Sequence, residues 1–362
     1  MKEDSLLNEK LHLLFEKCIA LGFPFSIYRL PETEEIQFVV QSSTEEIFIE
    51  SLDEIKDKSG FVIAPFHADK EHKLCFIRPD FTDFSFLEKQ FTSKKKVKVQ
   101  ERKVLSVQQK TFQKYVEHSM EKIGEKKFDK VVTARVVRYK KPAAFNEINY
   151  FLKVCEVYKW SFVSLAFVAS KGLWFGASPE LLLGYSNKNF TTFSLAGTMP
   201  NSNKNAWGEK EREEQEIVTK YIQNIASKIP QSQLKIEGPK TVSAGNVQHL
   251  LTTFKIQNAS HSNWCKLVNE LHPTPAVSGF PKQEAIQFII ENEKTNRSFY
   301  TGFLGPVNRN GEINLYVNLR CMEIQEKNLI LHVGCGVTHD SDSLKEWKET
   351  ELKSRTLLNL IE

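Results

Sequence analysis

Two segments far apart in the chain carry carboxylates whose types and spacing suit a metal site. The pairs are Glu211 with Glu214 and Glu346 with Glu349, each at i, i+3 spacing. Residues three apart share one face of a helix, so each pair presents two carboxylates in one direction. Mg²⁺ prefers oxygen ligands, keeps several waters and is often completed by anionic groups of a substrate. Each pair alone is a weak signal, because a solvated helix face explains it more readily. We assign the neighbouring Glu213 and Glu216 to such a face.

A lysine and a second glutamate stand beside apolar strand patterns, where burial is expected to shift their pKa values. Glu180 lies between a proline and the apolar run "LLLGY". Partial desolvation there raises the pKa of a carboxyl group and suits it to act as a general acid. Lys130 opens the apolar segment "KVVTARVV", where burial lowers the pKa of an amine toward that of a base. Spacing alone proves neither role.

Groups that suit an anion precede the second acidic segment. The apolar run before it ends in Gly334, Cys335 and Gly336, where backbone N–H groups can approach a carboxylate or phosphate closely. A tight turn explains the same glycines equally well. Arg320 and Tyr300 offer a bidentate guanidinium and a hydroxyl, both of which suit a carboxylate.

The elements that must position these groups follow from hydrophobic periodicity. Helices are expected at residues 6–21, 107–123, 145–157, 209–226, 282–293 and 343–360. Strands are expected at residues 129–139, 161–170, 173–178, 190–198, 298–307, 312–324 and 328–337. Many strands in hairpin-like succession with a few long helices indicate an α+β fold with large antiparallel sheets flanked by helices. The length allows either two domains or one large domain.

Composition excludes several classes of protein. The formal net charge of +4 over 362 residues is too small to imply nucleic acid. The basic run at residues 93–103 is interpreted as a solvated connection, with a non-catalytic anion- or RNA-binding protein as the alternative from a different class. Six scattered cysteines without metal spacing, no signal-peptide pattern and no long apolar window predict a cytoplasmic protein without a membrane partner.

Nine motifs in order resemble those of the chorismate-utilising enzymes, the anthranilate synthase component I-like superfamily. They are "DKVVTAR", "FGASPELLL", "LAGT", "KEREEQEIV", "QHLLT", "LHPTPAVSGFP", "FYTGFLG", "LR" and "GCGVTHDSDSLKEWKETELK". The resemblance covers about residues 110–360, and it is nearest to the isochorismate synthases of menaquinone and siderophore pathways. It implies Mg²⁺-dependent conversion of chorismate to isochorismate. It also implies a single large domain, with a variable N-terminal part and basic linker at residues 1–103 and a chorismate-binding catalytic region at residues 104–362.

The resemblance also implies a role for each matching residue. Lys130 matches the lysine that activates water for attack on ring carbon 2, and Glu180 matches the acid that protonates the hydroxyl leaving carbon 4. Glu214 and Glu349 match the Mg²⁺ ligands, with Glu211 and Glu346 as supporting carboxylates acting through water. The groups matching the enolpyruvyl-carboxylate site are Tyr300, Arg320, the backbone of Gly334, Cys335 and Gly336, and Lys353. His249 and Thr198 match residues that line the ring pocket, although a lone histidine is more often structural.

Two residues depart from the family pattern, and two branches of the superfamily fit less well. Gln215 stands where histidine is usual and Cys335 where alanine is usual, but neither change removes a catalytic group.

Lys130 disfavours the ammonia-adding enzymes, and Ala196 disfavours the aminodeoxychorismate synthases, so no glutamine amidotransferase subunit is expected. Salicylate synthases, which go on to eliminate pyruvate, remain the alternative. We expect a monomer.

Overall fold

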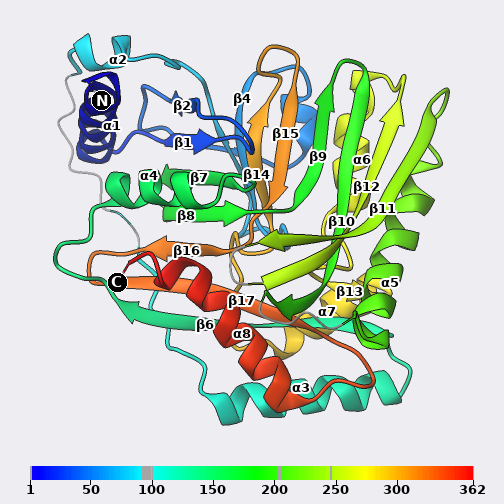
Figure 1. The fold of residues 1–362 in the computed structure, drawn as a ribbon. Coiled ribbons are helices and arrows are strands. Elements are labelled where there is room, and N and C mark those ends of the chain that lie inside the picture. The colour runs from blue at the N-terminus through cyan, green and yellow to red at the C-terminus, as the bar shows by residue number, and fades with distance from the viewer. Residues whose placement is uncertain (1, 92–98, 100, 202–205, 245–246, 362) are drawn as a thin grey trace.

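Two large antiparallel sheets pack face to face, with helices on their outer faces (Figure 1). The computed structural model describes residues 2–91, 99, 101–201, 206–244 and 247–361. The eight-stranded sheet runs in the order β13 (Gly279–Phe280), β6 (Lys130–Lys140), β17 (Asn328–Val337), β16 (Cys321–Ile324), β8 (Gly172–Ser178), β7 (Phe162–Val168), β1 (Phe25–Arg29) and β2 (Ile36–Val40). The predicted α+β class is confirmed.

The nine-stranded sheet completes the sandwich. Its order is β11 (Gln233–Ala244), β12 (Val247–Gln257), β10 (Asn189–Pro200), β9 (Leu181–Ser186), β15 (Ile313–Val317), β14 (Phe303–Val307), β4 (Gly60–Ala64), β5 (Leu74–Ile77) and β3 (Ile47–Ile49). The helices are α1 (Lys2–Leu21), α2 (Ser85–Glu88), α3 (Gln109–Gly124), α4 (Glu147–Val157), α5 (Glu209–Ala226), α6 (Trp264–Leu271), α7 (Lys282–Asn292) and α8 (Ser343–Leu358), with short 3₁₀ turns at Leu52–Ile55 and His261–Asn263.

Apolar side chains fill three layers. Between the sheets lies a core rich in aromatic residues, including Tyr28, Phe162 and Tyr316, in which the rings of Phe162 and Tyr316 stack at 4.3 Å. Helices α5 and α6 cover the outer face of the nine-stranded sheet. Helices α1, α3, α4, α7 and α8 cover the outer face of the other sheet. No helix within the described ranges is long and apolar enough to cross a membrane.

The N-terminal part of the chain belongs to both sheets rather than to a separate layer. Strands β1 and β2 extend the eight-stranded sheet beside β7. Strands β3, β4 and β5 extend the nine-stranded sheet beside β14. Most of the predicted basic connection at residues 93–103 lies outside the described residues, and Arg102 at its end contacts β16 through Glu323 at 2.8 Å.

Two strand predictions need correction. Residues 312–324 were expected to form one strand, but they form β15 in one sheet and β16 in the other. The chain turns between them at Arg320, whose φ of 48° breaks the extended backbone. Residues 298–307 were expected to form another, but only Phe303–Val307 is extended. A Cβ at Gly302 would lie 1.9 Å from the carbonyl oxygen of Ala64, so the chain passes too close to β4 for any other residue.

Candidate active site

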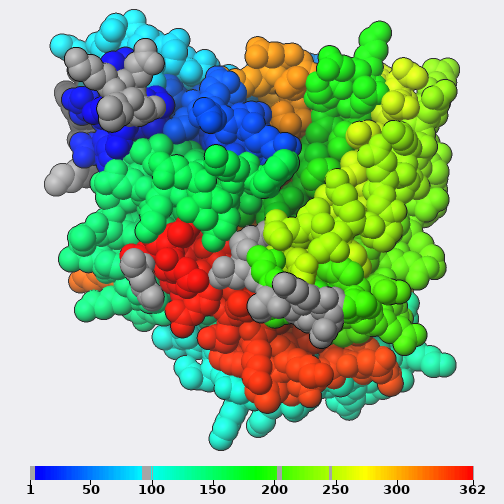
Figure 2. Space-filling view, viewed as in Figure 1, coloured from blue at the N-terminus to red at the C-terminus, as the bar shows by residue number. Residues whose placement is uncertain are grey.

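A cavity opens where β17, β10, β12, α5 and α8 meet. Figure 2 shows α8 (red) and the β11–β12 strands (yellow-green) near the middle of one face of the molecule. Ten of the predicted site residues line the cavity: Glu180, Thr198, Glu214, His249, Tyr300, Arg320, Gly334, Cys335, Gly336 and Lys353. Lys130, Glu211, Glu346 and Glu349 do not line it, and each is described separately below.

Strand β17 presents an edge of backbone to the cavity. Strand β6 pairs with β17 along its whole length, whereas β16 pairs with it only as far as His332. Lys353 Nζ donates to the carbonyl oxygen of Gly334 at 2.9 Å, so Gly334 faces away from β6. Gly336, two residues on, faces the same edge, and in an antiparallel strand the N–H and C=O groups of a residue point the same way. The glycines therefore lie within a strand, and the tight-turn alternative is wrong.

Both glycines are required by what packs against them. A Cβ at Gly336 would lie 2.3 Å from Oε1 of Glu214. A Cβ at Gly334 would lie 2.6 Å from the carbonyl oxygen of Thr133 and 2.8 Å from the hydroxyl of Tyr300. Contacts this short would displace these polar groups. The side chain of Cys335 points to the opposite face of β17, where Sγ lies 3.4 Å from Oγ1 of Thr133, so Cys335 offers the cavity only its backbone.

Lys130 and Glu214 form a buried ion pair behind the glycine edge. Lys130 is the first residue of β6 and is completely buried, and its Nζ lies 2.9 Å from Oε1 of Glu214. Burial of Glu214 by itself raises the pKa of the carboxyl group. The ammonium groups of Lys130, Lys210 and Lys353 outweigh burial and lower this pKa to about 2. Glu214 is therefore a carboxylate at neutral pH.

Helix α5 is anchored by the residue next to Glu214. Gln215 is buried, and its Oε1 accepts from the N–H of Ala196 at 2.9 Å. Its Nε2 donates to Ser194 O and to Thr252 Oγ1, each at 3.1 Å. All three partners lie on β10 and β12, so the glutamine that departs from the family pattern holds α5 to the sheet. This anchoring fixes the direction in which Glu214 projects.

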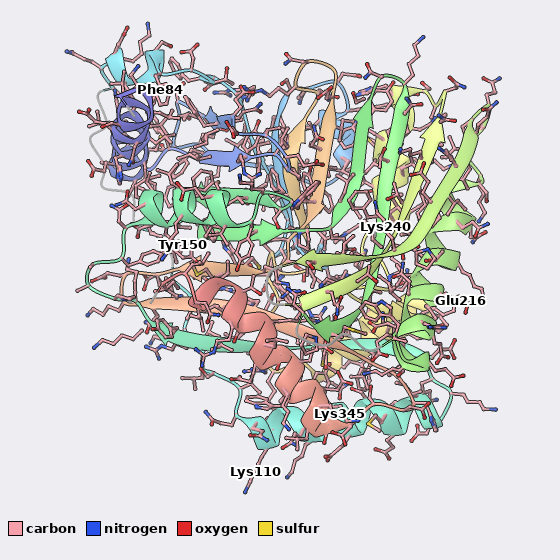
Figure 3. All side chains as sticks on the ribbon, viewed as in Figure 1. Phe84, Lys110, Tyr150, Glu216, Lys240 and Lys345 are labelled. Carbon is pink, nitrogen blue, oxygen red and sulfur yellow. The ribbon has the colours of Figure 1, made fainter. Side chains whose placement is uncertain are left out.

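The remaining acidic residues of α5 differ in position. Glu213 and Glu216 are exposed, as predicted, and Figure 3 shows Glu216 on α5 at the outer edge of the molecule. Oε2 of Glu211 lies beside Gly208, where a Cβ would approach it to 2.5 Å. The structure thus places the Glu211 carboxylate at the start of its own helix, and its supporting role stays a prediction.

Glu180 is a buried carboxyl group between β8 and β9. Its side chain lines the cavity and its Oε1 has no hydrogen-bond partner among the described residues. Burial raises the pKa of Glu180 to about 8, although the nearby Lys130 ammonium and Thr274 hydroxyl act in the opposite direction. Glu180 is therefore largely protonated at neutral pH, as a general acid must be.

The carboxylates of α8 are paired with lysines. Asp342 caps the helix by accepting from the N–H of Lys345 at 2.8 Å. Glu349 lies 2.6 Å from the ammonium of Lys353, one turn later. Glu346 is 1% exposed and forms an ion pair with Lys210 of α5, while its Oε2 has no hydrogen-bond partner in the described part of the chain. Burial and then Glu349 raise the pKa of Glu346.

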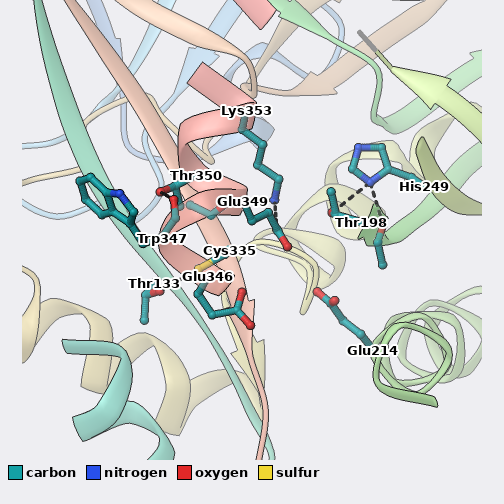
Figure 4. A network of polar contacts seen from close by, with 12 residues as sticks. Thr133, Thr198, Glu214, His249, Cys335, Glu346, Trp347, Glu349, Thr350 and Lys353 are labelled. Atoms are coloured by element: carbon teal, nitrogen blue, oxygen red, sulfur yellow. Dashed lines mark hydrogen bonds and ion pairs between the residues drawn. The ribbon is translucent and has the colours of Figure 1, made fainter. Parts of the chain in front are cut away.

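The carboxylates of α5 and α8 have the chemistry of ligands for a divalent cation. Figure 4 shows Glu214 and Glu349 pointing toward one another from α5 and α8, with Glu346 nearby. Within the described ranges, no three Asp, Glu, His or Cys side chains already converge as a complete metal site. Mg²⁺ commonly uses one or two protein carboxylates together with water and substrate oxygens. The partnerless oxygen of Glu346 is available as a further acceptor.

Arg320 and His249 are neighbours in the lining of the cavity. Nη2 of Arg320 lies 3.1 Å from Nε2 of His249, and Nη1 donates to Thr356 Oγ1 at 3.1 Å. Because a guanidinium only donates, Nε2 of His249 accepts, and its Nδ1–H faces Gly197 O at 2.8 Å. Burial, followed by the charges of Arg320 and Lys353, lowers the pKa of His249 to about 3. His249 is thus a neutral group that orients Arg320, and Thr198 lies 3.3 Å from its Nδ1.

Three residues near the site were missed by the sequence predictions. His332 lines the cavity between the rings of Trp174 and Tyr300, with both centroids at 5.4 Å. Lys210 pairs with Glu346, and the contacts of Gln215 to the sheet were not foreseen. His332 was detectable because it shares the strand face of Gly334 and Gly336 at two-residue spacing. The partner of Lys210 comes from a distant helix, so nothing in its local sequence indicates the pairing.

A family model described as "Chorismate binding enzyme" matches residues 54–362 of the chain. The chain belongs to this family. It is 31% identical over 301 residues to the isochorismate synthase EntC of Escherichia coli (strain K12), covering 79% of this chain and 76% of EntC. It is 27% identical over 261 residues to the isochorismate synthase MenF of Bacillus subtilis (strain 168), covering 68% of this chain and 55% of that relative.

Solved structures of chorismate-binding enzymes share the fold. MenF, the menaquinone-specific isochorismate synthase from Escherichia coli, superposes with a TM-score of 0.76 at 20% identity, covering 95% of this chain and 91% of that one. Anthranilate synthase component I from Streptococcus pneumoniae TIGR4 superposes with a TM-score of 0.67 at 16% identity, covering 92% and 89%. The predicted family resemblance and fold are therefore confirmed.

Proposed function

We propose that the protein is an isochorismate synthase, which converts chorismate to isochorismate. The observation that carries the proposal is the buried Glu180, whose pKa of about 8 keeps it protonated in a cavity that also holds carboxylates and cationic groups. Named isochorismate synthases among the relatives that cover most of the chain support the same reaction. The reaction adds the oxygen of one water at carbon 2 and releases the carbon 4 hydroxyl as another water.

Lys130 and Glu180 are proposed to move the protons. In its neutral form Lys130 removes a proton from the water that attacks carbon 2, while the ring double bond shifts and the bond from carbon 4 to its hydroxyl breaks. Glu180 gives its proton to that departing oxygen, because a hydroxide ion is a poor leaving group. Lys130 is fully buried, and its Nζ lies 2.9 Å from Oε1 of the cavity-lining Glu214, a position that supports this role.

We further propose that Glu214 and Glu349 hold Mg²⁺, with Glu346 as a supporting carboxylate. When bound, the cation would attract the ring carboxylate of chorismate and offset the negative charge of the two glutamates. The N–H groups of Gly334 and Gly336, with Tyr300, Arg320 and Lys353, would bind the enolpyruvyl carboxylate. His249 and Thr198 would line the ring pocket. The presence of both carboxylates and cationic groups around one cavity supports these assignments.

The protein is proposed to act as a monomer. No amidotransferase subunit is proposed, because water rather than ammonia is the nucleophile. Relatives include menaquinone-specific and vibriobactin-specific isochorismate synthases. We therefore propose that isochorismate from this protein feeds either menaquinone or siderophore biosynthesis. The neighbouring genes identify which of the two routes consumes it.

Product analysis tests the proposal. Purified protein, chorismate and Mg²⁺ are incubated at neutral pH, and the products are separated by chromatography. Isochorismate is expected from the wild type and from Glu213→Ala, whose side chain is exposed, but not from Lys130→Ala or Glu214→Ala. Wild-type protein that forms no isochorismate contradicts the function, and full activity in Lys130→Ala contradicts the mechanism. Salicylate with pyruvate as the main products would instead support a salicylate synthase.

A further inference from the structure

Among the described residues, Lys210 is the one lysine of the acidic site that the proposed reaction does not use. Three carboxylates, Glu214, Glu346 and Glu349, each form an ion pair with a lysine. The lysines paired with Glu214 and Glu349 are Lys130 and Lys353, which have proposed roles toward water and substrate. Lys210 does not line the cavity, so its role must be toward the carboxylates themselves.

The position of Lys210 is unfavourable for its own helix. It lies in the first turn of α5, where the helix dipole disfavours a positive charge. Its ammonium instead reaches across to the first turn of α8 and pairs with Glu346. Burial of Lys210 acts to lower its pKa, but the charges of Glu346, Glu214 and Glu349 raise it above the ordinary value. The lysine is thus held in this place by three carboxylates.

The two partners of the pair differ in exposure. The side chain of Glu346 is 1% exposed, whereas that of Lys210 is 25% exposed. Glu346 is therefore fixed inside the protein, and Lys210 has access to solvent. Breaking the pair without a replacement cation would leave a buried carboxylate uncompensated, which is strongly destabilising.

We propose that Lys210 is a built-in counter-cation, which neutralises the acidic site before a divalent cation binds and moves toward solvent when the cation arrives. This inference rests on the proposed metal site. Each of the three glutamates is paired with a lysine, and the partner of Glu346 is Lys210. Removing the charge of Lys210 leaves Glu346 without this partner, so the divalent cation no longer competes with an ammonium for Glu346.

Binding of Mn²⁺, a spin-active substitute for Mg²⁺, tests the inference. Free Mn²⁺ is measured by electron paramagnetic resonance during titration of wild type, Lys210→Met, Lys210→Arg and Lys220→Met, without substrate. Lys210→Met is expected to bind Mn²⁺ roughly tenfold more tightly. The repulsion between a lysine ammonium and a divalent cation in a partly buried site is larger than the energy that corresponds to a tenfold change in affinity. Lys210→Arg keeps the charge and should bind like wild type. Lys220→Met is the matched control, because Lys220 forms an exposed pair with Glu216 on the same helix.

Thermal unfolding provides a second measurement. In EDTA, Lys210→Met should unfold at a lower temperature than wild type, and saturating Mg²⁺ should remove most of the difference. Mn²⁺ binding by Lys210→Met that is equal to or weaker than wild type overturns the inference, as does a stability loss that Mg²⁺ does not reduce. Isochorismate formation is scored separately: wild type that binds Mn²⁺ but forms no product refutes the proposed function alone.

Discussion

Replacing Glu180 with glutamine should abolish activity and yet stabilise the protein in a pH-dependent way. The carboxyl group has an ordinary pKa of 4.5 and a pKa of about 8 in the folded protein. Below pH 4.5 the group is protonated in both the folded and unfolded states, and burial then costs no ionisation energy. Between these two values the unfolded chain ionises while the folded protein keeps its proton. The free energy of unfolding therefore falls as pH rises through this interval, and glutamine removes the effect.

The size of this effect follows from the two pKa values. At pH 7 keeping the carboxyl group protonated costs roughly 3 kcal/mol relative to a group that never ionises. The advantage of Glu180→Gln over wild type should accordingly grow by roughly 2.5 kcal/mol between pH 5 and pH 7. The glutamine amide also adds a donor that needs a partner, but that contribution is the same at both pH values. The change with pH thus isolates the ionisation of Glu180.

Urea denaturation at pH 5 and pH 7 measures the difference directly. Glu213→Gln, at an exposed position of α5, is the control and should differ from wild type equally at both pH values. Activity of the wild type should decline as pH rises above about 8, because the general acid then loses its proton. An advantage of Glu180→Gln that does not grow with pH would refute the assignment of a buried, protonated acid.

Three further substitutions test how the site is positioned. Gly336→Ala should lose nearly all activity while the protein stays folded, because the new methyl group would displace the Glu214 carboxylate 2.3 Å away; Gly124→Ala, where a Cβ meets nothing within 4 Å, should retain full activity. Gln215→Leu should destabilise the protein by roughly 2–4 kcal/mol in urea unfolding, since it leaves buried partners on β10 and β12 unsatisfied. Arg320→Lys should raise KM for chorismate at least tenfold with a smaller change in kcat, because a lysine cannot bind a carboxylate in a bidentate way.

Much of the fold was predictable from hydrophobic periodicity, and the errors in the predicted strands and helices have physical causes. The long helices appear close to the predicted residues because each has a continuous apolar face against a sheet. Residues 312–324 carry an equally continuous strand pattern, and nothing in it marks the change of sheet. The break depends on the left-handed backbone of Arg320, a conformation that is uncommon for arginine. The helix α6 is only 8 residues long and was not predicted.

The candidate site was predictable where chemistry depends on local spacing. Helical spacing made Glu214 and Glu349 candidates, and strand context made Lys130 and Glu180 candidates, but only the family resemblance gave each of them a role. Pairings between distant segments were not predictable, because the partner of Lys210 lies 136 residues away. For the same reason the sequence could not show whether Gly334 and Gly336 lie in a strand or in a tight turn. Only the packing of Glu214 and Tyr300 against β17 shows why a strand needs glycine at both positions.

The source of the oxygen in the product tests the central claim most directly. Chorismate is incubated with the protein and Mg²⁺ in water enriched in ¹⁸O, and isochorismate is examined by mass spectrometry. If water activated by Lys130 attacks carbon 2, the new hydroxyl carries ¹⁸O, and Lys130→Ala forms no labelled product. Isochorismate without ¹⁸O would show that the hydroxyl moves within the molecule, and absence of isochorismate would contradict the proposed function itself.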